Sequence, residues 1–60
     1  MMWRFVVDLG QDLHVVVARS ASGAKNVAFT ELQHQFSGSR KAFDTQVMGV
    51  RRIGPALDRN

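Results

Sequence analysis

The 60-residue sequence predicts a small α+β domain of the order β-β-α-β, with two strands, one helix and a third strand. Two segments alternate between apolar and polar residues and are joined by a short glycine-containing loop, as in a β-hairpin. A later segment repeats its apolar residues at helical spacing, and a valine-rich segment ends near the only proline. We therefore expect a three-stranded antiparallel or mixed sheet with one helix packed on one face. The expected domain covers residues 1–55, and residues 56–60 are expected to form a loose tail.

The first two predicted strands cover residues 2–9 (MWRFVVDL) and residues 13–19 (LHVVVAR). Residues 10–12 (GQD) suit a hairpin loop, because glycine tolerates the positive φ that such loops need. Pairing Leu9 with Leu13 would gather apolar side chains on a single face, as a buried face requires. The side chains expected on that face are Trp3, Phe5, Val7, Leu9, Leu13, Val15 and Val17.

Residues 20–38 are predicted to contain a helix with Ser22 as its N-cap and Gly38 as its end. A start at Lys25 stays open, because Gly23 and Asn26 are poor helix formers. Its apolar residues share one helical stripe. They are Ala24, Ala28, Phe29, Leu32 and Phe36. The following segment, residues 37–46 (SGSRKAFDTQ), is expected to be a loop or a frayed turn.

The third predicted strand covers residues 46–53 (QVMGVRRI), and Pro55 ends it because proline has no N–H to donate to a sheet. A right-handed crossover through the helix would bring this strand beside the first one. The expected order of strands in the sheet is therefore 2-1-3.

Several kinds of catalytic site are missing from the sequence. It contains no cysteine, which removes thiol nucleophiles and thiolate metal sites. Asp8 and His14 are expected to lie directly opposite each other, where a surface pair is the simpler interpretation. His14 and His34 do not have the spacing of a metal site, and the GSRK segment lacks the spacing of a phosphate loop. We therefore expect a protein that is not an enzyme, with no metal and no cofactor.

Charge and hydropathy indicate which partners the chain can contact and in which compartment it is expected. Eight Lys and Arg against five Asp and Glu give a net charge of +3. Such a charge permits contact with nucleic acid or with an acidic protein surface. No apolar run approaches the roughly 18 residues that a membrane span needs, and the first nine residues do not resemble a signal peptide. We expect a cytoplasmic protein without membrane contact.

The sheet face that the helix leaves uncovered is the first candidate surface for a partner. In the predicted register it carries Arg4, Val6, Asp8, His14, Val16 and Ala18. The third strand adds either Met48 and Val50 or Val47 and Ile53, depending on a bulge at Gly49. Half-exposed valines are ordinary in strands. Two interpretations therefore stay open, a plain solvated face or a face that docks on a second copy or a partner.

Two pairs of basic residues are further candidates. Successive side chains of a strand point to opposite faces, so Arg51 and Arg52 cannot hold one anion together. They either protect an edge strand from aggregation, or one of them binds a carboxylate or phosphate singly. Arg40 and Lys41 belong to the polar segment SGSRK, which is either an ordinary loop or a phosphate contact.

The pattern as a whole resembles the small RNA polymerase inhibitors encoded by podophages. The matching segments are FVVDL and HVVVA in the hairpin, FTELQHQF in the helix and VRRIGP in the last strand. The resemblance spans about residues 3–55 and implies the same β-β-α-β fold. It also implies a polymerase contact through arginines of the last strand, here Arg51 or Arg52. The chain differs from those inhibitors in its basic charge, where they carry an acidic strip, and in the spacing of arginines before the proline.

The favoured interpretation is a small non-enzymatic binding protein that makes protein–protein contacts. The resemblance implies a phage protein, an inhibitor or modulator of a host protein such as RNA polymerase, which takes over host transcription in the host cytoplasm. The residues expected to bind the partner are Arg51, Arg52, Arg40, Lys41, Arg4, Val6 and Val16. One alternative is a nucleic-acid-binding module in which Trp3 or Phe43 stacks on bases beside the basic residues. The other is a structural homodimer joined through the open sheet face.

Overall fold

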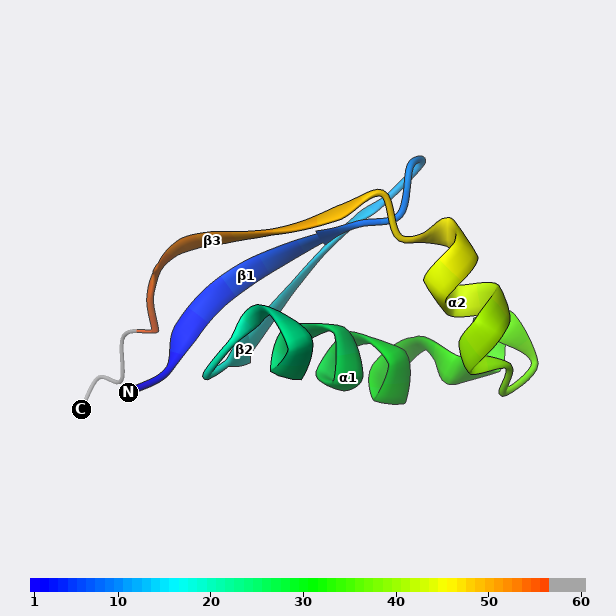
Figure 1. Ribbon diagram of the computed structural model, residues 1–60, viewed down its shortest axis with the longest axis horizontal. Helices are drawn as coiled ribbons and strands as arrows, with labels where there is room; N and C mark the ends of the chain where they lie inside the picture. The colour runs from blue at the N-terminus through cyan, green and yellow to red at the C-terminus, as the bar shows by residue number, and fades with distance from the viewer. Residues whose placement is uncertain (57–60) are drawn as a thin grey trace.

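The computed structural model describes residues 1–56, and residues 57–60, which make up most of the expected tail, lie outside the described part. The elements are β1 (Trp3–Asp8), β2 (Leu13–Ala18), α1 (Ala21–Leu32), the 3₁₀ helix η1 (Gln33–Phe36), α2 (Arg40–Gln46) and β3 (Gly49–Pro55). The predicted fold class is confirmed, because the three strands form one sheet in the order β2-β1-β3. Both outer strands run antiparallel to β1. The helices lie on one side of this sheet and leave its other side open (Figure 1).

The predicted register of the hairpin is wrong by one residue. Val6 pairs with Val15 and Val7 with His14, whereas the sequence predicted Val7 opposite Val15. The cause lies in the turn, where an Asp8 carboxylate oxygen accepts a hydrogen bond of 2.8 Å from the Gly10 N–H. This short-range bond ends β1 at Asp8 and makes the loop one residue longer than expected.

A shift of one residue turns every side chain of β2 to the other face. His14, Val16 and Ala18 therefore face the helices, and the expectation that they lie on the open face is wrong. The side chains of β2 on the open face are Leu13, Val15 and Val17, which were expected in the core.

The helical part begins two residues earlier than predicted and contains an additional helix. The Ser20 hydroxyl, not that of Ser22, accepts the N-capping hydrogen bond from the Gly23 N–H at 3.1 Å. The predicted single helix up to Gly38 is instead α1, which ends at Leu32, followed by η1, which ends at Phe36. The Gly38 N–H then donates to the Gln33 carbonyl at 2.8 Å. The expected loop over residues 37–46 instead contains α2, which the Ser39 hydroxyl caps through the Ala42 N–H.

The core lies between the sheet and the helices. Its buried members are Phe5, Val7, Val16, Ala18, Ala24, Ala28 and Phe43. Phe43 of α2 is fully buried and meets Phe29 and Phe36 edge to face, with ring centres 5.4 Å away in both cases. The second helix therefore closes the end of the core that α1 alone leaves open.

β3 contains a bulge, but not at the predicted place. Arg52 pairs with Phe5 and Gly54 with Arg4, so Ile53 has no partner and is the extra residue. Gly49, where a bulge was expected, pairs regularly with Asp8. Neither predicted pair of apolar residues describes the open face. Met48 and Ile53 are exposed, whereas Val47 and Val50 pack against the core.

Candidate functional site

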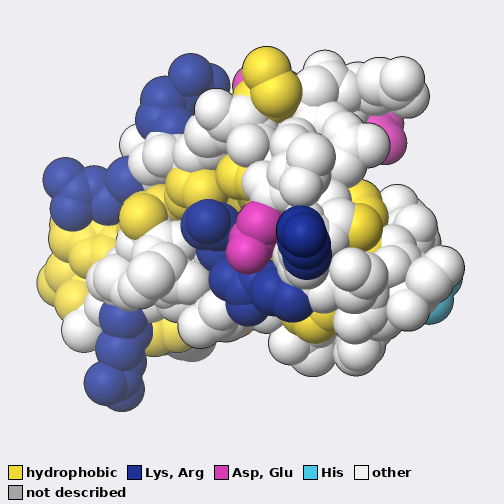
Figure 2. Space-filling model, turned by 45° about the vertical axis from the view of Figure 1, so that its right-hand side comes forward, with side chains coloured by type: hydrophobic (Ala, Val, Ile, Leu, Met, Phe, Trp, Pro, Cys, Tyr) yellow, Lys and Arg dark blue, Asp and Glu magenta, His cyan; other side chains and the backbone are white. Residues whose placement is uncertain are grey.

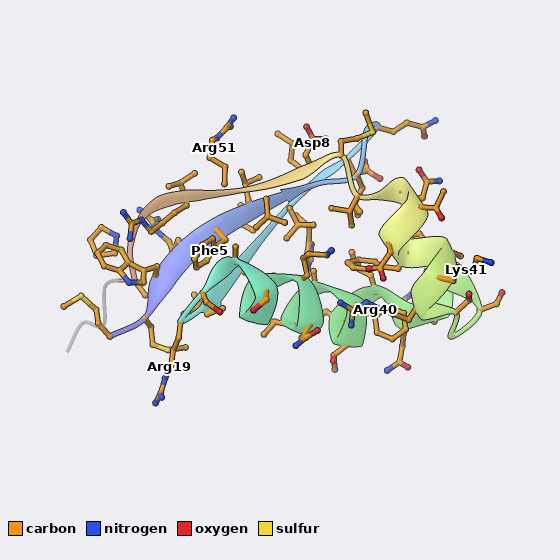
Figure 3. All side chains as sticks on the ribbon, viewed as in Figure 1. Phe5, Asp8, Arg19, Arg40, Lys41 and Arg51 are labelled. Atoms are coloured by element: carbon orange, nitrogen blue, oxygen red, sulfur yellow. The ribbon has the colours of Figure 1, made fainter. Side chains whose placement is uncertain are left out.

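We call the side of the sheet that faces away from the helices the open face. All three strands contribute to it, and Arg51 and Asp8 project from it in Figure 3, whereas Phe5 points toward α1. The side chains that alternation and register place on it are Arg4, Val6, Asp8, Leu13, Val15, Val17 and Arg51. Gly49 belongs to the same set but adds no side chain.

The open face is more apolar than a solvated sheet requires. Leu13 is 65% exposed, Val15 54% and Val17 43%, and Met48 beside them is 73% exposed. Val6 lies at the centre of the face and is only 6% exposed, yet it does not belong to the core cluster. Single exposed apolar residues are ordinary, but a contiguous group beside charged residues is typical of an interaction surface.

A hollow of about 350 Å³ opens on this face above Val6. Its lining residues are Val6, Asp8, Leu13, Met48, Gly49, Val50 and Arg51. Gly49 makes room for it, since a Cβ atom at this position would meet nothing within 4 Å. The lining of this space is mixed, because the carboxylate of Asp8, the guanidinium of Arg51 and backbone groups share it with the apolar side chains.

The charged groups of the open face differ in the hydrogen bonds and ion pairs that they make within the protein. One Asp8 oxygen accepts the Gly10 N–H, as described above. Arg51 has no carboxylate within ion-pair distance among residues 1–56, and its side chain points away from the protein (Figure 3). The guanidinium of Arg51 is therefore available to a carboxylate from outside.

Arg52 leaves the sheet on the other side, as strand alternation predicted. It lies opposite Phe5, and its guanidinium carbon is 4.3 Å from the centre of the Trp3 ring. A guanidinium over an indole ring is a stabilising cation–π contact. The two neighbouring arginines thus belong to different surroundings, and only Arg51 joins Arg4 on the open face.

Arg40 and Lys41 lie in α2, away from the other predicted binding residues (Figure 3). Arg40 donates to Asp44 at 3.0 Å and to Asn26 at 2.9 Å, and its guanidinium lies 5.5 Å from the centre of the Phe29 ring. Lys25 is 3.8 Å from the same Asp44 carboxylate. Figure 2 shows basic side chains on both sides of an acidic one, as these ion pairs require. Arg40 therefore ties α2 to α1, whereas Lys41 extends from the surface beside a shallow hollow of about 440 Å³.

Two further predicted placements are wrong. Val16 is 4% exposed and faces the helices, so it does not belong to the open face. His14 is not opposite Asp8, because Asp8 pairs with Leu13. The His14 Nε2 atom instead lies 2.7 Å from a Glu31 carboxylate oxygen and connects β2 to α1.

The contribution of β2 to the open face was not predicted from the sequence. Leu13, Val15 and Val17 were assigned to the core by the register that proved wrong. The segment Asp8-Leu9-Gly10 could have revealed them, since an aspartate two residues before a glycine favours the turn that ends β1 at Asp8.

Residues 1–56 contain no group of three His, Asp or Glu side chains placed to hold a metal ion. Within the same residues, no helix has the length and apolar character needed to cross a membrane. No family model matches this chain, and comparison with curated proteins and with solved structures finds no significant match.

Proposed function

We propose that this chain is a small non-catalytic protein that binds another protein through the open face of its sheet. The observation that carries the proposal is the guanidinium of Arg51, which has no ion-pair partner among residues 1–56, beside a hollow and a group of exposed apolar side chains. Protein interfaces commonly combine an apolar centre with arginine and a polar rim. The helices cover only the opposite side, so a partner can approach the whole face.

The charges of the open face favour an acidic partner. Arg4 and Arg51 supply two positive charges, whereas Asp8 supplies one negative charge and already accepts a hydrogen bond from Gly10. The chain as a whole carries a net charge of +3. A surface with carboxylates around an apolar residue would match this face in both charge and polarity.

The resemblance to phage-encoded polymerase inhibitors supports bacterial RNA polymerase as the first partner to test. In this proposal the protein acts in the host cytoplasm by occupying a surface of its partner, with no chemical step of its own. Arg51 is the arginine of the last strand that contacts the partner, since Arg52 is engaged with Trp3 on the other side.

Binding to nucleic acid has less support from the positions of the rings and charges. Phe43 is fully buried, so it cannot stack on a base, and Arg52 covers one face of the Trp3 ring. The basic side chains are also divided between the open face, the Trp3 side and α2. Single-strand binding usually needs exposed rings along one continuous basic groove.

The experiment compares Arg51→Glu with Arg19→Glu, which makes the same charge change elsewhere. Arg19 is exposed and projects away from the open face (Figure 3). The immobilised proteins are exposed to purified RNA polymerase, to single- and double-stranded oligonucleotides, and to a bacterial lysate read by mass spectrometry. Arg51→Glu should weaken binding of the protein partner about tenfold or more, whereas Arg19→Glu should bind like the unaltered protein.

Two outcomes would contradict the proposal. The first concerns the pattern of retained proteins. If every protein that binds both the unaltered chain and Arg19→Glu also binds Arg51→Glu, then Arg51 is not part of the binding surface. The second is binding of oligonucleotides that falls steeply with salt and weakens equally in both variants, which is the behaviour of phosphate-backbone binding.

A further inference from the structure

The hollow above Val6 differs from the rest of the open face in shape and in lining. Its lining combines the nearly buried Val6 with the exposed Leu13 and Met48, together with Asp8 and Arg51. Its volume of about 350 Å³ lies at the lower end of the range for pockets that bind small molecules. A space of this size can take one large side chain, and Val6, Leu13 and Met48 offer it apolar contacts beside the polar groups of the lining.

The charged groups at the rim of the hollow would orient a partner segment whose side chain enters it. Arg51 lies on the β3 side, where its guanidinium has no ion-pair partner within the described part of the chain, and Asp8 lies at the end of β1. Asp8 and Arg51 do not form an ion pair with each other. A partner segment that places a carboxylate on Arg51 and an N–H group near Asp8 would satisfy both rim charges while its apolar side chain fills the hollow.

We propose that this hollow is the anchor subsite of the open face. It takes one leucine, methionine or phenylalanine side chain from an acidic partner segment, whose neighbouring carboxylate binds Arg51. This inference rests on the proposed function and names the feature of the partner that the face recognises. A buried apolar anchor surrounded by a polar rim commonly carries most of the binding energy of an interface.

Gly49 provides a variant that fills the hollow without disturbing the fold. A Cβ at this position meets no atom within 4 Å, and the residue begins a strand, where valine is a better strand former than glycine. Gly49→Val should therefore keep or raise the thermal stability while it occupies the space meant for the anchor. Gly49→Ala adds a smaller group and should have a smaller effect.

The test is an NMR titration with three capped pentapeptides. The first is acidic with a central phenylalanine, the second has alanine at the centre, and the third has lysines in place of the acidic residues. The phenylalanine peptide should cause saturable shifts of the Val6, Gly49 and Arg51 amides, with an affinity about tenfold higher than either other peptide. Gly49→Val should lose at least about tenfold of this affinity, and the control Arg19→Glu should not.

Equal binding of the phenylalanine and alanine peptides, or unchanged binding by Gly49→Val, would overturn the anchor subsite. The same variant is then measured against the protein partner. If Arg51→Glu loses that partner and Gly49→Val retains it, the open face binds but the hollow is not its anchor. If neither variant loses the partner, the proposed function itself fails.

Discussion

The guanidinium carbon of Arg52 lies 4.3 Å from the centre of the Trp3 ring, on the side of the sheet that faces the helices. Arg51, the preceding residue, projects from the open face and has no ion-pair partner among residues 1–56. Strand alternation alone thus gives two adjacent arginines different roles. Arg52 contacts Trp3 at the start of β1, whereas Arg51 makes no ion pair with any carboxylate among residues 1–56.

Replacing Arg52 should lower stability more than replacing Arg51. Arg52→Ala removes the contact with Trp3 and should lower the free energy of unfolding by about 0.5–1 kcal/mol. Arg51→Ala changes an exposed side chain and should stay within about 0.5 kcal/mol. Urea unfolding followed by Trp3 fluorescence measures both. Equal stability of the two variants, with no change of Trp3 emission in Arg52→Ala, would show that the contact contributes nothing.

The register of β2 predicts opposite results for two neighbouring valines. Val16→Asp buries a charge against the helices without a partner and should unfold the domain. Val15→Asp places the same charge on the exposed open face, where the fold should survive. Circular dichroism of both variants decides the matter, and a folded Val16→Asp beside an unfolded Val15→Asp would restore the register predicted from the sequence.

Phe43 should be among the most sensitive positions of the core. Its ring is fully buried and contacts the rings of Phe29 and Phe36. Phe43→Ala should cost about 3–5 kcal/mol, as should Phe5→Ala in the sheet. For a domain of this size such a loss can exceed the total stability. Calorimetry should show a lowered or absent unfolding transition, and a transition temperature unchanged in Phe43→Ala would contradict the packing of α2 on the core.

The contact between His14 and Glu31 should contribute little to stability. Their side chains are 30% and 53% exposed, so water screens the 2.7 Å contact. A double-mutant cycle with His14→Ala and Glu31→Ala should give a coupling of about 0–1 kcal/mol. A coupling well above that range would mean that this pair, rather than apolar packing, holds β2 against α1.

The sequence was sufficient to predict three strands and their order, but not the bounds of the third strand or the register of the hairpin. β3 covers Gly49–Pro55 rather than residues 46–53, because α2 extends to Gln46. In β2 both alternating sets contain valine, so periodicity could not decide which set faces the core. The decision came from one side-chain bond in the turn, between Asp8 and Gly10. The alternating pattern shows which residues share a face, but the hydrogen bond in the turn determines which residues of β1 and β2 pair.

The second helix and the hollow could not be predicted from the sequence, because both depend on contacts between distant residues. α2 has only seven residues, and such a short helix is stable only through its packing, here that of Phe43. The opposite placement of Arg51 and Arg52 could be predicted because alternation within a strand is a local property. The hollow depends on Gly49, Val6 and Leu13 coming together from three strands, which required the correct register.

Hydroxyl-radical footprinting of the protein bound to its partner distinguishes binding through the open face from binding through the helices. Met48 is exposed on the rim of the open face, whereas Met1 is exposed at the chain start and Phe36 is half-buried on the helix side. Binding through the open face should protect Met48 and Leu13 from oxidation and leave Met1 and Phe36 unchanged. Protection of Phe36 while Met48 stays fully reactive would place the partner on the helices and contradict binding through the open face.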